Sequence, residues 1–338
     1  MNVIVPVHCC AHRYYAKGHE MNILLTGSSG FIGGAIWQTL RQRKVTVRPV
    51  FRTSASALTA GCPVDEAVIV PTLDAATDWV QALVGVDVIV HCAARVHVMQ
   101  DNVTDPLTEY RRVNVDGTLR LAQQAAAAGM RRFVFISSIK VNGEGTQPGR
   151  PYSADDTPAP EDAYGISKAE AEADLHKLAQ EMGMELVIIR PVLVYGPGVK
   201  GNFLTMLRWV RRGFPLPLGA VVKNRRSLVA LDNLVDLICT CVNHPNAANQ
   251  TFLVSDGEDL STADLLQRLG QAMGKKVHLL AIPVWLLHLA ARLLSKGAIA
   301  QRLLGSLQVD ISKTRTLLGW QPPLSVDEGL KKLVEHQG

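Results

Sequence analysis

The chain has 338 residues, of which 47% are hydrophobic and 19% charged, a composition that is typical of a well-packed globular protein and excludes a disordered chain. Its formal net charge of +5 is mild and comes without a basic block or interleaved aromatic residues, so we expect no nucleic-acid partner, although an anionic substrate would suit it. The six cysteines lack the spacing of a disulfide framework, and no apolar run reaches the ~20 residues that span a bilayer. We therefore expect a cytoplasmic protein.

Residues 1–20 precede the first predicted strand, and we expect them to form a disordered extension. They include Cys9 and Cys10 together with three histidines, but adjacent cysteines suit tetrahedral metal binding poorly, so we expect no metal site there. The apolar run at 3–7 is too short for the core of a signal peptide.

From Met21 onward, short apolar runs alternate with longer helical stretches. Strands are predicted at 22–26, 45–51, 67–70, 87–91, 132–136 and 185–189, and helices at 31–43, 76–84, 105–128 and 162–182. Apolar strands that alternate with helices predict a parallel sheet covered on both faces, an α/β fold of the doubly wound type. Past Arg190, prolines and glycines gather and short helices follow. We therefore expect one domain at 21–190 and a smaller lobe at 191–338.

The segment Gly27-Ser-Ser-Gly-Phe-Ile-Gly33 lies between the first predicted strand and the first predicted helix. In such a motif the first glycine makes the tight turn, the second lets the backbone approach a pyrophosphate, and the third lets the helix pack on the sheet. The N–H groups and positive dipole end at the start of the helix favour phosphates. The order of strand, turn and helix therefore predicts a dinucleotide site in the domain at 21–190.

The residues at the end of the second predicted strand indicate which dinucleotide binds. An acidic residue there normally accepts the ribose hydroxyls of NAD, but the segment 47–54 contains no Asp or Glu. Arg52, followed by Thr53 and Ser54, stands where a 2′-phosphate would lie, and its fork of donors suits a phosphate. We expect NADP(H), with NAD(H) as the alternative if Arg52 is only a solvated surface residue.

Tyr164 and Lys168 are four residues apart on a predicted helix and share one of its faces. A free tyrosine titrates near pH ~10, and a cation beside it favours the phenolate and lowers its pKa towards the working range. Ser138 follows the predicted strand at 132–136, which places a hydroxyl at the sheet edge where ligands bind. Beside a nicotinamide, these residues predict proton transfer coupled to hydride transfer.

Together these motifs resemble those of extended short-chain dehydrogenases/reductases in the NAD-dependent epimerase/dehydratase family, which act on nucleotide-activated sugars. The resemblance runs from about Met21 to the C-terminus. It implies a Rossmann-type fold with a small C-terminal substrate-binding lobe, and a catalytic triad in which Ser138 donates a hydrogen bond to the C4 oxygen of the sugar. Tyr164 would transfer the proton, and Lys168 would also hold the nicotinamide ribose.

The resemblance also implies which residues contact the ligands. The cofactor would contact Gly27, Ser29, Gly30, Phe31, Ile32, Gly33, Arg52, Thr72, Leu73, Ala93, Ala94, Tyr164, Lys168 and Pro191. The substrate would contact Ser138, Tyr164, Asn202, Leu216, Leu218 and Arg226. An arginine suits a diphosphate because its fork bonds two oxygens at once, and the adjacent Arg225 is the alternative for this role.

Three functions are compatible with the resemblance. The leading expectation is a UDP-sugar 4-ketoreductase that reduces the C4 ketone of a UDP-2-acetamido-2,6-dideoxy-4-hexulose with NAD(P)H in O-antigen synthesis. The alternative is a UDP-hexose 4-epimerase that uses tightly bound NAD. A dinucleotide-sensing regulator is a third alternative, against which the intact triad weighs because a regulator need not keep it.

Two helical segments predict how the molecule associates. The resemblance implies a homodimer in which the helices at 105–128 and 162–182 pair into a four-helix bundle.

The segment 283–294 is unusually apolar. We expect it to form a core helix of the small lobe, with a weak peripheral membrane contact as the alternative.

Overall fold

The computed structural model describes residues 21–96, 105–147, 149–294 and 296–336. The predicted extension at 1–20, with Cys9 and Cys10, lies outside these residues. The first described strand begins at Asn22.

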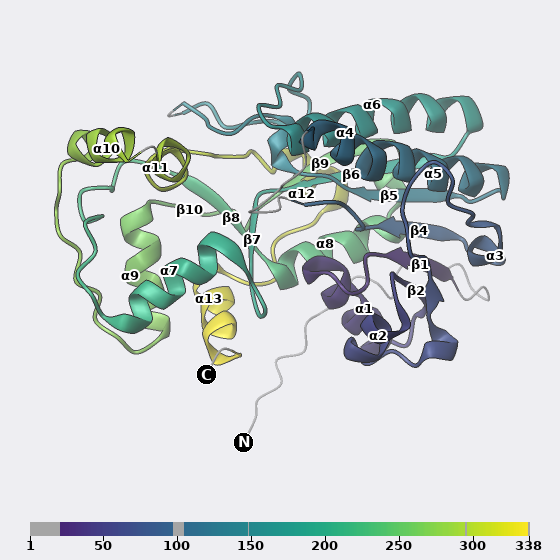
Figure 1. Cartoon of the computed structure of the whole chain (residues 1–338), viewed down its shortest axis with the longest axis horizontal. Coiled ribbons are helices and arrows are strands. Elements are labelled where there is room, and N and C mark those ends of the chain that lie inside the picture. Colours follow the sequence, from purple (N-terminus) through teal and green to yellow (C-terminus); the bar gives the residue numbers. More distant parts are fainter. Residues whose placement is uncertain (1–20, 97–104, 148, 295, 337–338) are drawn as a thin grey trace.

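A seven-stranded parallel sheet forms the larger part of the molecule (Figure 1), in the order β3-β2-β1-β4-β5-β6-β9. Its strands are β1 (Asn22–Thr26), β2 (Thr46–Phe51), β3 (Val68–Ile69), β4 (Val88–His91), β5 (Arg132–Ile136), β6 (Glu185–Pro191) and β9 (Gln250–Val254). The order reverses between β1 and β4, and a sheet of this kind binds ligands outside the carboxyl ends of its strands at such a reversal. The predicted doubly wound fold is confirmed, and the glycine segment 27–33 lies at the reversal.

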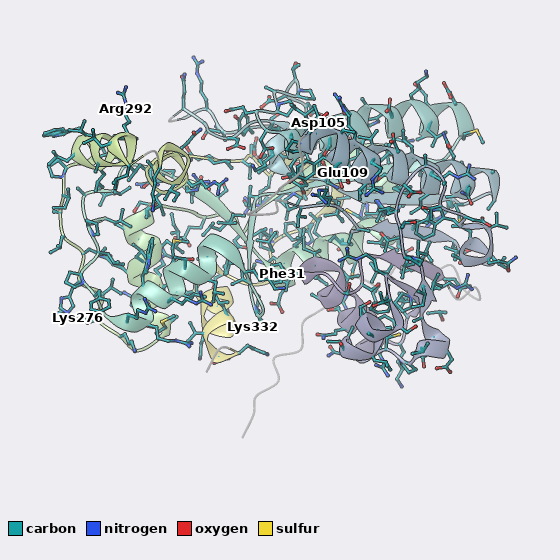
Figure 2. The ribbon with its side chains drawn as sticks, viewed as in Figure 1. Phe31, Asp105, Glu109, Lys276, Arg292 and Lys332 are labelled. Carbon is teal, nitrogen blue, oxygen red and sulfur yellow. The ribbon has the colours of Figure 1, made fainter. Side chains whose placement is uncertain are left out.

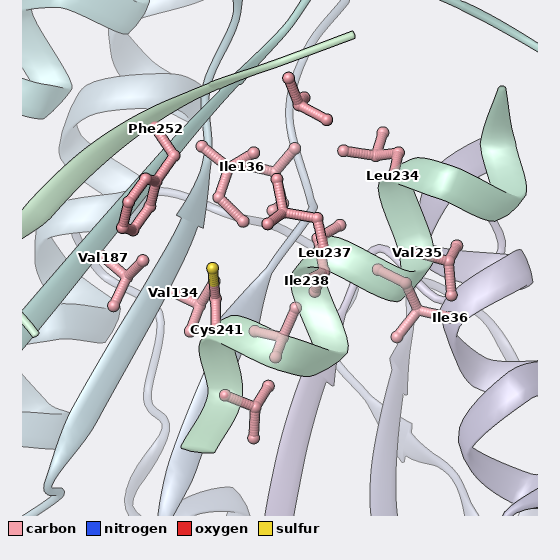
Figure 3. Close-up of a cluster of buried hydrophobic side chains, with 14 of the residues drawn as sticks. Ile36, Val134, Ile136, Val187, Leu234, Val235, Leu237, Ile238, Cys241 and Phe252 are labelled. Carbon is pink, nitrogen blue, oxygen red and sulfur yellow. The ribbon is translucent and has the colours of Figure 1, made fainter. Parts of the chain in front are cut away.

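Helices cover both faces of this sheet because alternate strand residues point to opposite sides. One face packs against α1 (Phe31–Gln42), α8 (Leu231–Asn243) and α12 (Ser312–Leu318), and the other against α3 (Val80–Leu83), α5 (Gly117–Ala127) and α6 (Ala163–Met182). Figure 3 shows Leu237 and Cys241 of α8 close to Val134 of β5, whereas the neighbouring Phe133 and Phe135 belong to the core on the opposite face. The helix α4 (Pro106–Arg111) packs beside α6.

The seventh strand comes from the part of the chain that we expected to build the small lobe. The strand β9 pairs in parallel with β6, through Ile189 and Phe252 among others, and α8 packs beneath the same sheet. The expected boundary at residue 190 therefore does not separate the two parts, because the chain enters the small lobe after β6 and returns to the sheet at β9.

The small lobe occupies one end of the molecule (Figure 1) and has its own apolar core. It contains β7 (Leu193–Tyr195), β8 (Arg226–Ala230), β10 (Asp259–Leu260), α7 (Gly201–Arg212), α9 (Thr262–Ala272), α10 (Val284–Leu293), α11 (Gly297–Leu304) and α13 (Val326–Glu335). Ser261 begins α9 and Ser325 begins α13, each with a capping box that satisfies N–H groups of the first turn.

The expectation that the apolar segment 283–294 forms a core helix is wrong. It forms α10, but no residue of α10 is buried, and Trp285 is 65% exposed. No described helix is long and apolar enough to cross a membrane.

Candidate active site

The glycine segment forms a cradle that side chains would fill. Gly27 has a φ of +74°, and a Cβ on it would lie 2.8 Å from the backbone nitrogen of Ala93. A Cβ on Gly33 would overlap the carbonyl oxygen of Gly27. The helix α1 starts at Phe31 with no side-chain cap and no acidic residue in its first turn, so the N–H groups of that turn suit an anionic phosphate.

Phe31 also joins the two parts of the molecule. Its side chain packs against the core of the sheet domain and against the core of the small lobe. Figure 2 shows Phe31 at the start of α1, where the sheet domain meets the lobe. The glycine segment therefore lies at the junction between the two.

Two fully buried polar side chains, His91 and Asn114, hold the end of β4 and the residues that follow it. His91 lies between Thr26 and Thr118, with nitrogen-to-oxygen distances of 2.8 and 3.0 Å, and burial lowers its pKa to about 3. Asn114, in a π-helical turn before α5, accepts a hydrogen bond from the backbone of Arg95 and donates to the hydroxyl of Ser167 on α6. These contacts hold the half-buried Ala93 and Ala94 next to the glycine cradle.

The structure brings the three predicted catalytic residues together. Ser138 follows β5 and begins a short 3₁₀ turn, where its hydroxyl accepts a hydrogen bond from the backbone of Lys140 at 3.3 Å. Tyr164 lies in the first turn of α6, which Asp162 caps by accepting from the backbone of Gly165. A hydrogen bond joins the side chains of Ser138 and Tyr164.

The pKa of Tyr164 is raised, mainly by burial and then by the nearby carboxylate of Asp162, while the hydrogen bond with Ser138 lowers it. We expected the ammonium of Lys168 to lower this pKa. Instead, Lys168 donates a hydrogen bond to the carbonyl oxygen of Ile136 at 2.8 Å and lies 4.1 Å from the ring centre of Phe135. Burial lowers the pKa of Lys168 to about 8.

A buried ion pair behind the triad was not predicted from the sequence. Glu172, one turn beyond Lys168 on α6, accepts hydrogen bonds from Arg190 of β6, with an Nη2–Oε2 distance of 2.5 Å. The hydroxyl of Ser137 also donates to Glu172, and Arg190 donates to Asn142 at 3.0 Å. This network ties α6 to the loop that carries Ser138. Its only local signal in the sequence is an acid four residues after Lys168.

Arg226 of the small lobe lies near the loop 137–144 that follows β5, which we call the catalytic loop, and Arg302 of α11 lies near Arg226. Burial lowers the pKa of Arg226, the guanidinium of Arg302 on α11 lowers it further, and Glu144 of the catalytic loop raises it. Arg225 is exposed and bonds the carbonyl oxygens of Val222 and Asn224. The structure thus distinguishes the half-buried Arg226 from its neighbour, and adds Arg302, which no sequence motif marks.

The other predicted ligand residues lie in less direct positions. The side chains of Leu216 and Leu218 are buried in the core of the lobe, and the backbone N–H and C=O of Leu216 are already bonded to His278 and Leu280. Asn202 belongs to α7, but its side chain is not among the described ones. Pro191 ends β6 and is buried, and the half-buried Leu73 packs against Gly117.

A model of the NAD dependent epimerase/dehydratase family matches residues 23–255, which include the glycine cradle and the triad. The chain belongs to this family. A relative, the UDP-glucose 4-epimerase of Vibrio cholerae, is 49% identical over 316 residues, which cover 93% of this chain and 94% of the relative.

Two solved structures of epimerases have the same fold as this chain. The UDP-glucose 4-epimerase of Thermotoga maritima, solved with UDP-glucose, is 22% identical with a TM-score of 0.73, over 94% of this chain and 98% of that one. The UDP-glucuronic acid 4-epimerase of Bacillus cereus, solved with NAD, is 21% identical with the same TM-score, over 94% and 96%. These similarities confirm the fold expected from the sequence.

Like other members of the NAD dependent epimerase/dehydratase family, the protein takes a nicotinamide dinucleotide, and its glycine cradle fits one. A hollow of about 360 Å³ adjoins the cradle and is lined by Ser29 and by residues of α2 (Ser54–Thr59). Arg52 is exposed after β2, while the hydroxyl of Thr53 caps α2. Arg52 therefore lies two residues before α2, whose residues line the hollow, but is not itself part of the lining.

Proposed function

We propose that the protein is a UDP-hexose 4-epimerase that uses NAD, with UDP-glucose as its first candidate substrate. The observation that carries this proposal is the 49% identity, over nearly the full length of both chains, to a protein named UDP-glucose 4-epimerase. It favours the epimerase, which was the alternative in our sequence analysis, over the 4-ketoreductase.

The triad has the groups that such a reaction needs. A nicotinamide held at the glycine cradle would supply the hydride acceptor for C4 of the sugar and the hydride donor to its opposite face, and the positive charge of its oxidised form would favour the Tyr164 phenolate. Tyr164 takes the proton of the C4 hydroxyl through its Oη atom and later returns it. Ser138, hydrogen-bonded to Tyr164, stabilises the charge that develops on the C4 oxygen.

The two arginines of the lobe fit the rest of the substrate. Arg226 and Arg302 lie close enough for the charge of one to lower the pKa of the other. Two neighbouring guanidinium groups suit a diphosphate, because the fork of each can bond two of its anionic oxygens. We propose that they bind the diphosphate of UDP and so place the sugar at Tyr164.

The proposal is tested on the nucleotide that the purified protein carries. We expect NAD in stoichiometric amount on denaturation, and conversion of UDP-glucose into UDP-galactose with no added cofactor. Tyr164→Phe is the control, since it should carry the same NAD and form no UDP-galactose. A nucleotide-free enzyme that leaves UDP-glucose unchanged would refute the epimerase.

The 4-ketoreductase is the second candidate, because Arg52 and the missing acid at the end of β2 favour a 2′-phosphate. In that case the protein oxidises NADPH when given a UDP-4-keto-6-deoxy-N-acetylhexosamine. Arg52→Asp should then narrow the preference for NADPH over NADH by ~1–3 kcal/mol, the value of a charge-assisted pair. Lys44→Asp is the control. Lys44 is exposed and lies two residues before the start of β2, so this change should leave the preference for NADPH over NADH unchanged.

A further inference from the structure

The helix α10 is apolar on two opposite faces. At 100° per residue, Val284, Leu287 and Ala291 fall on one side, where Val284 and Leu287 pack against the core of the lobe. Trp285, Leu289 and Leu293 fall on the opposite side and are 65%, 48% and 78% exposed. A helix that is apolar all round is normally buried. The exposed face of α10 therefore indicates a surface that is covered in the functional protein.

This face continues beyond the helix. Leu294, just after α10, is 68% exposed, and Ile299 of α11 is 46% exposed. In Figure 1, α10 and α11 lie side by side at the outer end of the small lobe, far from the seven-stranded sheet. We call the set Trp285, Leu286, Leu289, Leu293, Leu294 and Ile299 the outer patch.

Two exposed basic residues, Arg292 and Lys296, lie on α10 or just after it, beside the outer patch. No Asp or Glu occurs in the 45 residues between Asp264 and Asp310, which contain six Arg or Lys. Arg268 among them is paired with two carboxylates, whereas Arg292 and Lys296 are exposed. Arg292 borders the apolar stripe on α10, and Figure 2 shows its side chain pointing away from the ribbon.

From the apolar stripe and this charge, we infer that the outer patch docks on an anionic phospholipid bilayer. A helix of ten residues is ~15 Å long, which is too short to span a bilayer but long enough to lie in its interface. Tryptophan and leucine insert there while Arg292 and Lys296 reach the phosphate headgroups. A second copy of the chain fits the patch less well, because it would bring two basic surfaces of the same sign together.

The purified full chain can be tested directly with lipid vesicles. We expect it to co-sediment with vesicles of phosphatidylglycerol and phosphatidylcholine, to bind pure phosphatidylcholine less, and to dissociate as salt is raised. Trp37, Trp79 and Trp320 are buried, and the partly buried Trp209 packs against the core of the small lobe. A blue shift of emission on binding should therefore come from the exposed Trp285. Trp285→Phe should lose the shift.

Two double variants show whether vesicle binding depends on the outer patch or on exposed apolar side chains anywhere on the surface. Leu289→Ser with Leu293→Ser should lower the ratio of vesicle-bound to free protein at least about tenfold. Val80→Ser with Val84→Ser, which removes two exposed apolar side chains of the sheet domain, should leave binding unchanged. Both should keep the turnover of the soluble enzyme, since neither pair touches the triad, so this test does not depend on the proposed function.

Two results would overturn the inference. One is vesicle binding that is absent at low salt or equal in both double variants. The other is concentration-dependent self-association that Leu289→Ser with Leu293→Ser abolishes, since the patch would then be an interface between copies.

Discussion

Tyr164 and Lys168 lie one helical turn apart, and burial acts on them in opposite directions. Removing water favours the neutral form of each group. It raises the pKa of the Tyr164 phenol and lowers the pKa of the Lys168 ammonium to about 8. Protein groups alone therefore keep Tyr164 protonated at neutral pH, and the positive charge of an oxidised nicotinamide would be needed to favour the phenolate that takes the C4 proton.

Tyr164→Phe should reduce kcat by ~10²–10⁴, because only the proton-transferring oxygen is lost. Binding of the dinucleotide, measured by titration, should change little. Tyr110→Phe is the control, since its ring lies edge-on to Tyr164 with centres 6.0 Å apart and the ring is kept. If Tyr164→Phe retained more than about a tenth of kcat, Tyr164 would not be the catalytic acid.

The pKa of Lys168 predicts how stability changes in alkaline solution. In the unfolded chain a lysine titrates near ~10.4, whereas Lys168 in the folded protein titrates near pH 8. Because the unfolded state then binds more protons between these values, this group adds to the stability of the folded state as pH rises through that window.

Lys168→Met removes this titration. Urea unfolding at pH values from 8 to ~10 should show the free energy of unfolding of the wild type rising relative to that of the variant. A difference that stays flat, or that falls with pH, would contradict the lowered pKa of Lys168.

At the scale of elements, α6 carries two of the three proposed catalytic residues, Tyr164 and Lys168. One interaction holds the helix before this pair and another holds it after the pair. Asp162 caps its first turn, and Glu172 joins it to β6 through Arg190. The side chains of Glu172 and Arg190 are only 4% and 6% exposed. The position of Tyr164 is therefore set by a partly exposed cap on one side and by a buried ion pair on the other.

Glu172→Gln should lower the free energy of unfolding by ~3–5 kcal/mol, because it leaves the charge of Arg190 buried without a counter-ion. Glu170→Gln is a matched control two residues earlier on α6. Its partner Arg111 is 47% exposed, and loss of an exposed pair should cost only ~0–1 kcal/mol. Equal losses in urea unfolding would show that the buried pair has no special role.

At the scale of the whole molecule, the site is assembled from two parts of the chain that meet at the glycine cradle. The sheet domain carries Ser138, Tyr164 and Lys168, and the small lobe carries the two arginines proposed for the diphosphate, Arg226 and Arg302. Phe31 packs against the cores of both parts. We propose that the lobe selects the substrate while the sheet domain performs the reaction.

We also propose that the protein forms a homodimer through α4, α5 and α6, the bundle that the resemblance implies. These helices contact one another along one face of the sheet domain, on the far side from α10 in Figure 1. Light scattering at micromolar concentration should give the mass of two chains, and the same mass for Leu289→Ser with Leu293→Ser. A monomer would count against the dimer.

The sequence by itself determined the features that depend on neighbours along the chain. A turn that needs a positive φ at Gly27, and two side chains four residues apart on one helix, are local, so their spacing predicts them. The apolar runs likewise predicted the first six strands and the order of strand and helix, because burial on both faces of a sheet requires them.

Only the tertiary structure decided which distant segments meet. The strand β9 joins β6 across the whole of α7 and α8, Arg190 meets Glu172, and Arg302 comes beside Arg226. The same holds for α10. Its apolar residues predicted a buried helix, but a helix is buried only where another element covers it, and in this fold one face of α10 packs on the lobe while the opposite face meets solvent. Such pairings depend on how layers pack in space, which the spacing of residues along one segment does not specify.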